Sequence, residues 1–345
     1  MTNIAFLMQM LKKNPKFAYM ALRLSTYYHS EDIPALPGDN LFHSTELFRV
    51  LEQTPGYTPV MLVAFEGESP VGKLLSITRR QFSLWGGWSK TFVYGTGEYF
   101  GGSMKREEVF REMLAYLTLR HEEDSFLIEF RNLEEPLFGY RYFRANVVRA
   151  GETPKAMVRN SIHQELIDKW MSASRKRQIH NGLKHGAVME VARSEEDVCA
   201  LFAMLRQYYL PKIHRYFPDI RFFLSLISEP SQRELGKIFV IKYRDKVIGG
   251  SVCLFSGDCA YLLFSGGMRK SYAWLYPGVL AVWNAMLYAR EQGYAHFEFI
   301  DAGLPFRRYG FRDFILRFGG KQLSSRRWFR VRWEWLNRLL IKIYV

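Results

Sequence analysis

The sequence lacks most of the short motifs that mark well-known active sites. Its three cysteines, Cys199, Cys253 and Cys259, contain no Cys-x-x-Cys pair, so neither a disulfide framework nor a common zinc site is indicated. No P-loop, Gly-x-Gly-x-x-Gly or Gly-x-Ser-x-Gly segment occurs, and no pair of histidines at helical spacing flanks a glutamate. We therefore expect no metal site and no serine-hydrolase centre.

The sequence also gives no sign of a targeting segment or of a membrane-spanning segment. The first ten residues have no basic start and no small-residue cleavage site. Ser271–Ala289 is 19 residues without a charge, but it contains Pro277, Gly278 and Asn284, which favours a buried loop and helix over a membrane span. We expect a cytoplasmic protein, at most peripheral at the inner face of the membrane.

Positive charge and aromatic residues are abundant. The net charge of the 345 residues is +14, and aromatic residues make up 16%. Residues 306–338 hold ten Lys/Arg and two Asp/Glu, a net charge of +8. Such a balance favours an anionic partner, which could be nucleic acid, a phosphorylated small molecule or an acidic membrane surface.

Two stretches of the chain share one hairpin pattern. Residues 61–77 and 238–255 each read as an apolar run, a short polar turn, a small Val/Ile-Gly step and a second apolar run. Gly72 in the first stretch matches Gly249 in the second. The repeat predicts two similar β-hairpins, one in each half of the chain.

The segments after each hairpin repeat as well. A strand runs into a Gly-rich loop in 91–102 and again in 260–270, a helix with an apolar stripe follows each, and short strands follow at 125–131 and 295–301. This order predicts an α/β (α+β) chain with two tandem domains. We expect them at residues 1–160 and 161–345.

The two Gly-rich loops are candidate anion sites. Gly95–Gly102 and Ser265–Gly278 each enter a helix, whose free backbone N–H groups and dipole suit a phosphate or pyrophosphate. In the second loop, Arg269, Lys270 and Gly278 are the candidate contacts. The alternative is that these glycines only permit tight turns.

Acid–base chemistry would fall to carboxylates at strand ends. Glu129, Glu298 and Asp301 lie on the two short strands or directly after them, and ligands gather at the carboxyl ends of strands in α/β sheets. Asp301 is the first candidate base, followed by Glu298, and Tyr276 is a candidate proton donor or acceptor. Asp301 could instead cap a turn.

These segments resemble the Fem-type acyltransferases with tandem GNAT folds. "SRKRQIHNGLKHGAVMEV" is similar to the basic helix that opens the family's second domain, and "YPGVLAVWNAMLYAREQGYAHFEFIDAG" is similar to its Pro-led helix and following strand. Phe314 and Phe318-Gly319 are similar to its "FKxxFG" element, with Ile315 where the family has lysine. The resemblance implies two GNAT-like domains, each a mixed, mostly antiparallel sheet flanked by helices.

The basic segment after Asp301 would then border the active site. Arg307, Arg308, Arg312 and Arg317 are the candidate contacts for the phosphates of CoA or an RNA end. The alternative is a solvated basic face over ordinary core aromatics.

The function implied is transfer of an acyl or aminoacyl group to an amine of a cell-envelope or lipid-linked precursor. The donor is acyl-CoA or aminoacyl-tRNA, with no tightly bound cofactor; tRNA is a possible partner and the oligomeric state is open. One alternative is an N-acyltransferase that uses acyl-CoA or acyl-carrier protein on a small molecule. Another is a basic nucleic-acid-binding or non-catalytic GNAT-like protein.

The C-terminal segment "RRWFRVRWEWLNRLLIKIYV" combines arginines with tryptophans. Its spacing predicts a strand up to Trp335, with Trp333 and Trp335 on one face, and then a helix. A final strand closing the second domain and a packed helix would explain it. The alternative is contact with an anionic membrane surface, where tryptophan and arginine are favoured.

Overall fold

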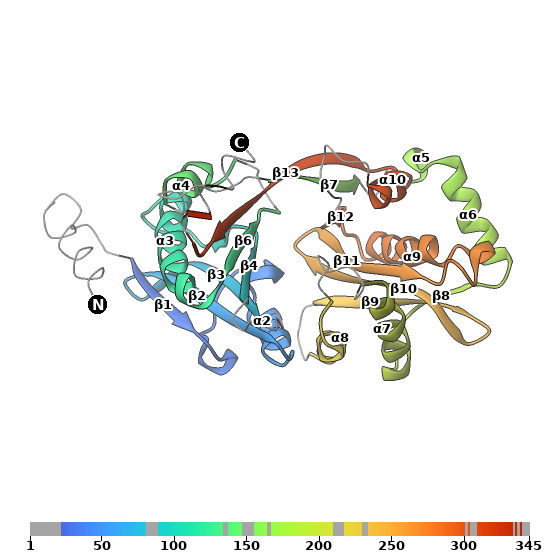
Figure 1. The fold of residues 1–345 in the computed structure, drawn as a ribbon, viewed down its shortest axis with the longest axis horizontal. Helices are drawn as coiled ribbons and strands as arrows, with labels where there is room; N and C mark the ends of the chain where they lie inside the picture. Colours follow the sequence, from blue (N-terminus) through green and yellow to red (C-terminus); the bar gives the residue numbers. More distant parts are fainter. Residues whose placement is uncertain are drawn as a thin grey trace, which may run out of the picture.

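The computed structural model shows one long sheet that runs through both halves of the molecule, with helices packed on its faces (Figure 1). The structure describes residues 22–80, 89–133, 137–146, 155–163, 167–209, 217–229, 234–300, 303, 309–333, 335–336 and 339.

The first half contributes short 3-10 segments, helices and strands. The helical segments are η2 (Ser30–Asp32), η3 (Leu41–His43), α2 (Thr45–Glu52), α3 (Arg106–Asp124) and α4 (Tyr140–Asn146). The strands are β1 (Arg23–Tyr27), β2 (Tyr57–Glu66), β3 (Ser69–Arg80), β4 (Ser89–Tyr94), β5 (Glu98–Tyr99), β6 (Leu127–Arg131) and β7 (Lys155–His163).

The second half repeats most of this order. The helical segments are α5 (Ile167–Trp170), α6 (Ala173–Lys184), α7 (Glu195–Tyr209), α8 (Ile220–Ser228), η5 (Ala273–Leu275), α9 (Pro277–Glu291) and α10 (Gly310–Leu316). The strands are β8 (Val188–Val191), β9 (Gly236–Tyr243), β10 (Lys246–Ser256), β11 (Cys259–Gly267), β12 (His296–Phe299) and β13 (Lys321–Val331).

Counted inward from either edge of the sheet, equivalent strands of the two halves follow one another in the same order. It runs β1-β2-β3-β4-β6-β13-β7-β12-β11-β10-β9-β8, so β2, β3, β4 and β6 correspond to β9, β10, β11 and β12. The last strand of each half crosses over: β13 pairs with β6, and β7 pairs with β12. The predicted fold class and the repeat are confirmed. The predicted boundary after residue 160 falls inside β7 and stays a prediction.

The two hairpins share a local irregularity. In β2–β3 the register shifts so that Val71 is the extra residue before Gly72, and in β9–β10 Ile248 is the extra residue before Gly249. Each bulge is therefore followed directly by the matched glycine. A bulge bends its strand locally, so its repetition at the same step supports a shared architecture.

Each half packs its parallel strand pair against one helix. Val93 and Phe130 belong to a core with α3, and Leu262 and Phe299 belong to a core with α9. Both helices carry the apolar stripe that the sequence predicts. α9 starts with Pro277 at its first position, where the missing N–H costs no hydrogen bond.

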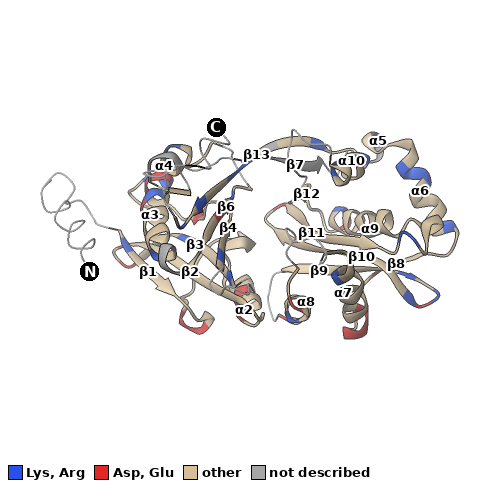
Figure 2. Ribbon diagram, viewed as in Figure 1, with Lys and Arg blue, Asp and Glu red and all other residues tan. Residues whose placement is uncertain are grey.

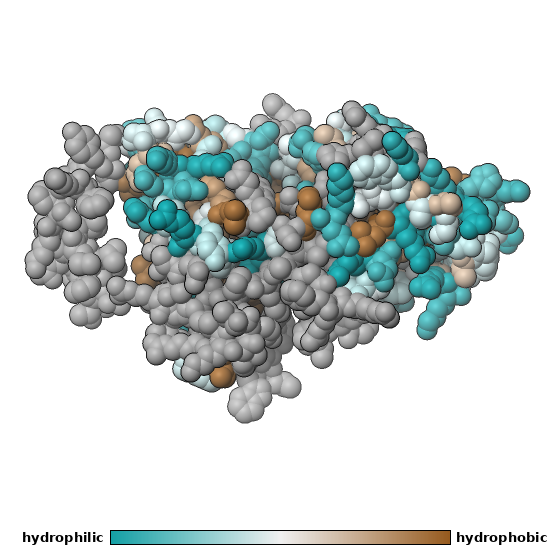
Figure 3. Space-filling model, turned by 90° about the horizontal axis from the view of Figure 1, so that it is seen from above, coloured by the Kyte–Doolittle hydropathy of each residue, from teal (hydrophilic) through white to brown (hydrophobic). Residues whose placement is uncertain are grey.

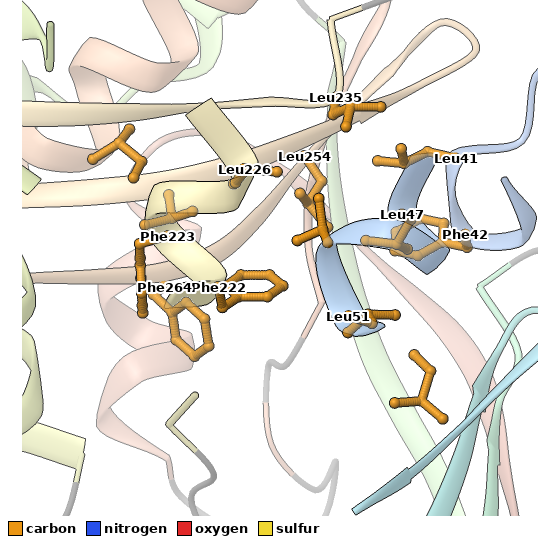
Figure 4. Close-up of a cluster of buried hydrophobic side chains, with 14 of the residues drawn as sticks. Leu41, Phe42, Leu47, Leu51, Phe222, Phe223, Leu226, Leu235, Leu254 and Phe264 are labelled. Carbon is orange, nitrogen blue, oxygen red and sulfur yellow. The ribbon is translucent and has the colours of Figure 1, made fainter. Parts of the chain in front are cut away.

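A third core joins the halves on the opposite face of the sheet. Figure 4 shows side chains from η3 and α2 facing side chains from α8, β10 and β11. Polar contacts accompany them: the Ser225 hydroxyl donates to the side-chain amide oxygen (Oε1) of Gln53 at 3.0 Å, and Arg49 forms an ion pair with Glu229. The halves therefore share buried apolar surface as well as the two exchanged strands.

Ser271–Ala289 forms a loop, η5 and most of α9, as the sequence predicts. Among the described residues, no helix is long and apolar enough to cross a membrane. In the same part of the chain, no group of three or more His, Cys, Asp or Glu side chains could hold a metal ion.

Candidate active site

Among the residues that the structure describes, the parallel pairing of β11 with β12 ends before β11 does. The register of β11 with β12 runs from Cys259 and His296 to Leu262 and Phe299, whereas β11 stays paired with β10 as far as Gly267. The end of β11 therefore has peptide groups that point toward the β12 side beyond the last residue pair. Backbone donors held in this way can bind a carbonyl oxygen or an oxyanion.

Tyr209, at the end of α7, contacts this open edge of β11. Its hydroxyl donates to the Ser265 carbonyl oxygen at 3.2 Å and accepts from the Ser265 N–H at 3.4 Å. The Tyr209 ring stacks on Phe217, with 5.3 Å between the ring centroids. A phenol is thus held beside the backbone of the separated strand. Sequence analysis missed Tyr209 because no local pattern links residue 209 to residue 265.

The loop from β11 to α9 ends in a strained residue. Tyr276 has φ 48° and ψ 47°, a left-handed conformation that is unfavourable for residues with a Cβ. Its carbonyl oxygen accepts the N–H groups of Val279 and Leu280 at 2.8 and 3.1 Å. Strain of this kind persists where the surrounding structure fixes it, and it is common at functional sites.

Glycines allow the start of α9 to touch the sheet. A Cβ on Gly267 would lie 2.5 Å from the Gly278 nitrogen, and a Cβ on Gly249 would lie 3.0 Å from Pro277. Both distances leave no room for a side chain. The N-terminus of α9, with the positive end of its dipole, is therefore held beside the open end of β11.

Four of the predicted site residues come together here. Tyr276 and Gly278 form the junction of the loop with α9, and Arg269 and Lys270 are exposed in the same loop. Glu298 is the third residue of β12, is 6% exposed, and is the register partner of Tyr261. Asp301, Arg307 and Arg308 lie outside the described residues.

Arg312 and Arg317 lie on α10 and at its C-terminal end, with Arg317 exposed. The aromatic residues of this segment are core: Phe318 is fully buried, and Phe311 and Phe314 pack against the core of α9. Their cationic neighbour comes from elsewhere in the chain, because the Arg175 guanidinium lies 4.5 and 4.4 Å from the ring centroids of Phe314 and Phe318.

Arg175 ties α6 to α10. It is 2% exposed, and its Nη2 donates to the Phe314 carbonyl oxygen at 2.7 Å. Burial lowers the pKa of Arg175 to about 10, and the nearby charge of Arg317 adds to this shift. The other cations of α6 are exposed along the helix, which Figure 2 shows in blue. Sequence analysis noted the basic helix but not this buried arginine.

In the first half, the place that corresponds to the glycine-lined end of β11 is filled with side chains. Where the second half has Gly250, Gly266 and Gly267, the first half has Lys73, Glu98 and Tyr99. Lys73 and Glu98 form a buried ion pair, with Nζ and Oε2 3.1 Å apart.

The N–H groups before α3 are also occupied. The carboxylate of Glu66 accepts the N–H groups of Ser103 and Met104 at 2.8 and 3.0 Å. These bonds lower the pKa of Glu66. The first Gly-rich loop therefore holds an anion of its own chain, which the sequence pattern did not reveal.

A cavity of about 190 Å³ lies between the halves. It is lined by Asp39, Asn40, Phe42, Tyr94, Gly95, Leu133, Ser256, Gly257 and Tyr261. These residues are far apart in the sequence, so no local pattern predicts the cavity. Its position, close to β4, β6 and β11, makes it a candidate site for the second substrate.

Residues 171–308 match the family model described as an acetyltransferase (GNAT) domain. A search of curated proteins finds no relative of this chain. The fold is similar to the crystal structure of FemX, with a TM-score of 0.60, 12% identity and coverage of 92% of this chain and 99% of that chain.

Two further solved structures share the fold. One is a tandem GNAT protein from the clavulanic acid biosynthesis pathway, with a TM-score of 0.53, 11% identity and coverage of 91% and 99% of the two chains. The other is L-PGS from Bacillus licheniformis, with a TM-score of 0.52, 12% identity and coverage of 90% and 98%. The predicted resemblance to FemABX-like proteins with GNAT folds is confirmed at the level of the fold.

Proposed function

We propose that this acyltransferase, whose residues 171–308 match the acetyltransferase (GNAT) domain model, places an acyl or aminoacyl group on an amine of a cell-envelope or lipid-linked precursor. The donor is an acyl-CoA or an aminoacyl-tRNA. The observation that carries the proposal is the open end of β11, where Ser265 and Tyr209 meet beside the N-terminus of α9.

The donor binds in the second half. There the glycines of β11 allow α9 to approach, so the Gly278 N–H and the helix dipole face an anionic group, with Arg269 and Lys270 exposed in the same loop. In the first half Tyr99 and the carboxylate of Glu66 take the equivalent places. This difference favours one donor site in the chain.

Transfer to an amine has three chemical requirements. The oxyanion of the tetrahedral intermediate needs donors, and the Ser265 N–H meets this need once the donor carbonyl replaces the Tyr209 hydroxyl. After the amine nitrogen has bonded to the acyl carbon, the bond from that carbon to the donor sulfur or ribose oxygen breaks, and Tyr209 gives a proton to the departing atom, which leaves as a thiol or a hydroxyl. The attacking amine must be neutral, and its proton goes to Glu298 on β12 or to Asp301, which follows that strand in the sequence.

The C-terminal segment supports an acceptor that is presented at a membrane. The rings of Trp333 and Trp335 stack, with centroids 6.1 Å apart, and both are exposed at 46% and 65%. β13 itself ends at Val331, so the predicted extension of the strand to Trp335 is wrong. Exposed tryptophans beside Arg330 and Arg332 fit the interface of an anionic bilayer.

Mass spectrometry of the small molecules that copurify with the protein tests the proposal. A bound CoA thioester or an aminoacylated RNA fragment would support it, especially if Gly267→Val abolished the copurification. Recovery of a redox cofactor or a nucleotide with no acyl group, equal in the wild type and the variant, would contradict it.

A further inference from the structure

The two matched hairpins differ in charge at their turns. Two residues join β2 to β3 after Glu66, and two residues join β9 to β10 after Tyr243, which are Arg244 and Asp245. Tyr243 therefore corresponds to Glu66, whose carboxylate accepts the N–H groups before α3. The second half has an uncharged side chain at the position of the carboxylate that fills the anion site of the first half.

The turn of the second hairpin holds an arginine in an unfavourable conformation. Arg244 and Asp245 have φ 47° and 62°, in the left-handed region that disfavours residues with a Cβ. In the first hairpin Gly67 takes the place of Arg244. Two-residue turns of this kind favour Asn-Gly, so turn formation does not explain the arginine. Backbone strain of this sort is common at functional sites.

Four exposed cations lie on this turn and on the loop into α9. Two belong to the hairpin and two to the loop, namely Arg244, Lys246, Arg269 and Lys270. The loop starts along β10, because the Met268 N–H donates to the Ile248 carbonyl oxygen at 2.7 Å. In the part of the chain that the structure describes, no carboxylate forms an ion pair with any of the four. With Asp245 included, the net charge is positive, which favours an anionic ligand.

A row of aromatic rings connects the turn with the loop. The Tyr272 ring lies 6.0 Å from the Tyr243 ring and 5.8 Å from the Trp274 ring, measured between centroids. The Lys246 ammonium lies 5.9 Å from the centroid of Tyr272, and the Arg244 guanidinium lies 5.2 Å from that of Tyr243. Trp274 ends the row and is 50% exposed, so its indole is open to a stacking partner.

The aromatic row is fixed beside the N-terminus of α9. Trp274 belongs to η5, which is followed by Tyr276 and α9. η5 packs closely on α6, because a Cβ on Gly182 would lie 2.5 Å from the Leu275 carbonyl oxygen. Figure 2 shows basic residues in blue on α6 and on the β9–β10 turn, at the same end of the molecule. A ligand at the start of α9 could therefore extend onto this surface.

We propose that this surface binds a nucleotide of the acyl donor, with its base on Trp274 and its phosphates on the exposed cations. Base–aromatic stacking beside cations is how single-stranded nucleic acids are commonly held. This inference rests on the proposed function. In a CoA thioester the nucleotide is the phosphorylated adenosine, and in an aminoacyl-tRNA it is a nucleotide of the single-stranded end.

Calorimetric titration with unacylated CoA, and separately with a short single-stranded RNA, tests the surface without any transfer reaction. Trp274→Ala removes the stacking face and should weaken binding about tenfold. Arg244→Asn removes a cation at a position where asparagine tolerates the left-handed conformation. It should weaken binding about threefold or more and make it less dependent on salt.

The controls are an exposed tryptophan and an exposed arginine elsewhere. Trp170→Ala, on α5, and Arg193→Gln should bind both probes as the wild type does. Thermal unfolding checks each variant, and Trp274→Leu, which keeps apolar bulk, replaces Trp274→Ala if that variant does not fold.

Equal binding by the wild type, Trp274→Ala and Arg244→Asn would overturn the inference. If Gly267→Ala then bound neither probe, the donor site beside α9 would remain and the proposed function would stand. Failure of the wild type to bind either probe would overturn the inference and contradict the proposed donor site as well.

The two probes distinguish the source of the nucleotide. Weaker binding of CoA alone in both variants assigns a CoA thioester, and weaker binding of the RNA alone assigns an aminoacyl-tRNA. Weaker binding of both assigns a nucleotide site that either donor can use. If Trp274→Ala bound both probes normally but sedimented less with anionic vesicles, the surface would be a membrane contact and the inference would be overturned.

Discussion

Glu129 and Glu298 occupy the same position in the two halves of the chain. Glu129 is the third residue of β6, which runs parallel to β4. Glu298 is the third residue of β12, which runs parallel to β11. Their neighbours on either side face α3 in one case and α9 in the other, so both carboxylates lie on the opposite face of the sheet. Glu298 lies beside Tyr261, whereas Glu129 is buried and forms ion pairs with three cations, which are Lys90, Arg131 and Arg327.

The position of Glu129 predicts a structural role. Glu129→Gln leaves three cations close together without their carboxylate, and breaking a buried ion pair in this way costs about 3–5 kcal/mol of unfolding free energy. Urea unfolding at neutral pH measures the loss. Glu112→Gln is the control, because Glu112 pairs with Arg111 on a half-exposed surface and should change stability little.

The difference in unfolding free energy between the wild type and Glu129→Gln should depend on pH. Although burial opposes the shift, the three neighbouring cations depress the folded-state pKa of Glu129, so its contribution is present above the unfolded pKa of about 4.3 and is lost as the pH falls through the folded value. The difference in stability between the wild type and Glu129→Gln should therefore shrink on acidification below this range. A difference that stayed constant down to the acid transition would contradict the ionised cluster.

Tyr209 is predicted to act in the reaction. Tyr209→Phe removes the hydroxyl that contacts Ser265 but keeps the stacked ring, so kcat should fall by roughly 10²-fold or more, as expected for loss of a general acid. Tyr208→Phe is the matched control, since the neighbouring tyrosine is 43% exposed. Equal transfer rates in the two variants would remove Tyr209 from the mechanism.

Asp301→Ala is expected to lower the transfer rate at least about tenfold, since a general base typically contributes ~10²–10⁴ in rate. The change in stability should be small, about 0–1 kcal/mol, for a carboxylate with no structural role. Steady-state rates and thermal unfolding are measured side by side, with Glu298→Gln in parallel. Full activity of Asp301→Ala and loss in Glu298→Gln would transfer the role of base to Glu298, and unfolding of Asp301→Ala would favour a turn-capping role.

Sedimentation with liposomes tests the proposed membrane contact. Each basic residue near an anionic surface is worth ~1 kcal/mol, so the full chain should sediment with anionic but not with neutral vesicles. A form ending at Asn337 should bind less, because it lacks Arg338 and the apolar residues after it. Equal recovery in the supernatant with both lipids would contradict membrane binding. Undiminished binding of the shorter form would exclude the residues after Asn337 and leave either the exposed Trp333 and Trp335 or another basic surface as the contact.

The local pattern of apolar residues and glycines was sufficient to predict the repeated architecture. The apolar runs of β2 and β9, the Val71-Gly72 and Ile248-Gly249 steps, and the stripes of α3 and α9 are all readable within short windows, because each element folds against one neighbouring face. The reciprocal crossing of β7 and β13 was not predicted. It depends on pairing between strands far apart in the chain, for which alternation along one strand carries no information.

The candidate site was predictable only in part. The Gly-rich loop and the Pro-led helix mark Tyr276 and Gly278 directly, because a turn and a helix start have local signatures. Tyr209 and the cluster around Glu129 have none, since their partners Ser265 and Arg327 come from distant strands. The aromatic residues of 310–321 also needed the structure, because the cation that stacks on them is Arg175, from another helix.

Transfer of labelled acyl groups in the Gly267→Ala variant tests the central claim most directly. Purified protein is incubated with acyl-CoA or aminoacyl-tRNA carrying a radiolabelled acyl group and with a membrane-precursor extract, and alkali-stable amide product is counted. The wild type should form product from one donor, and Gly267→Ala, whose added Cβ would lie 2.5 Å from the Gly278 nitrogen, should not. Gly310→Ala, where an added Cβ meets nothing within 4 Å, should match the wild type. No product from either donor with the wild type, or undiminished product with Gly267→Ala, would contradict acyl transfer at the open end of β11.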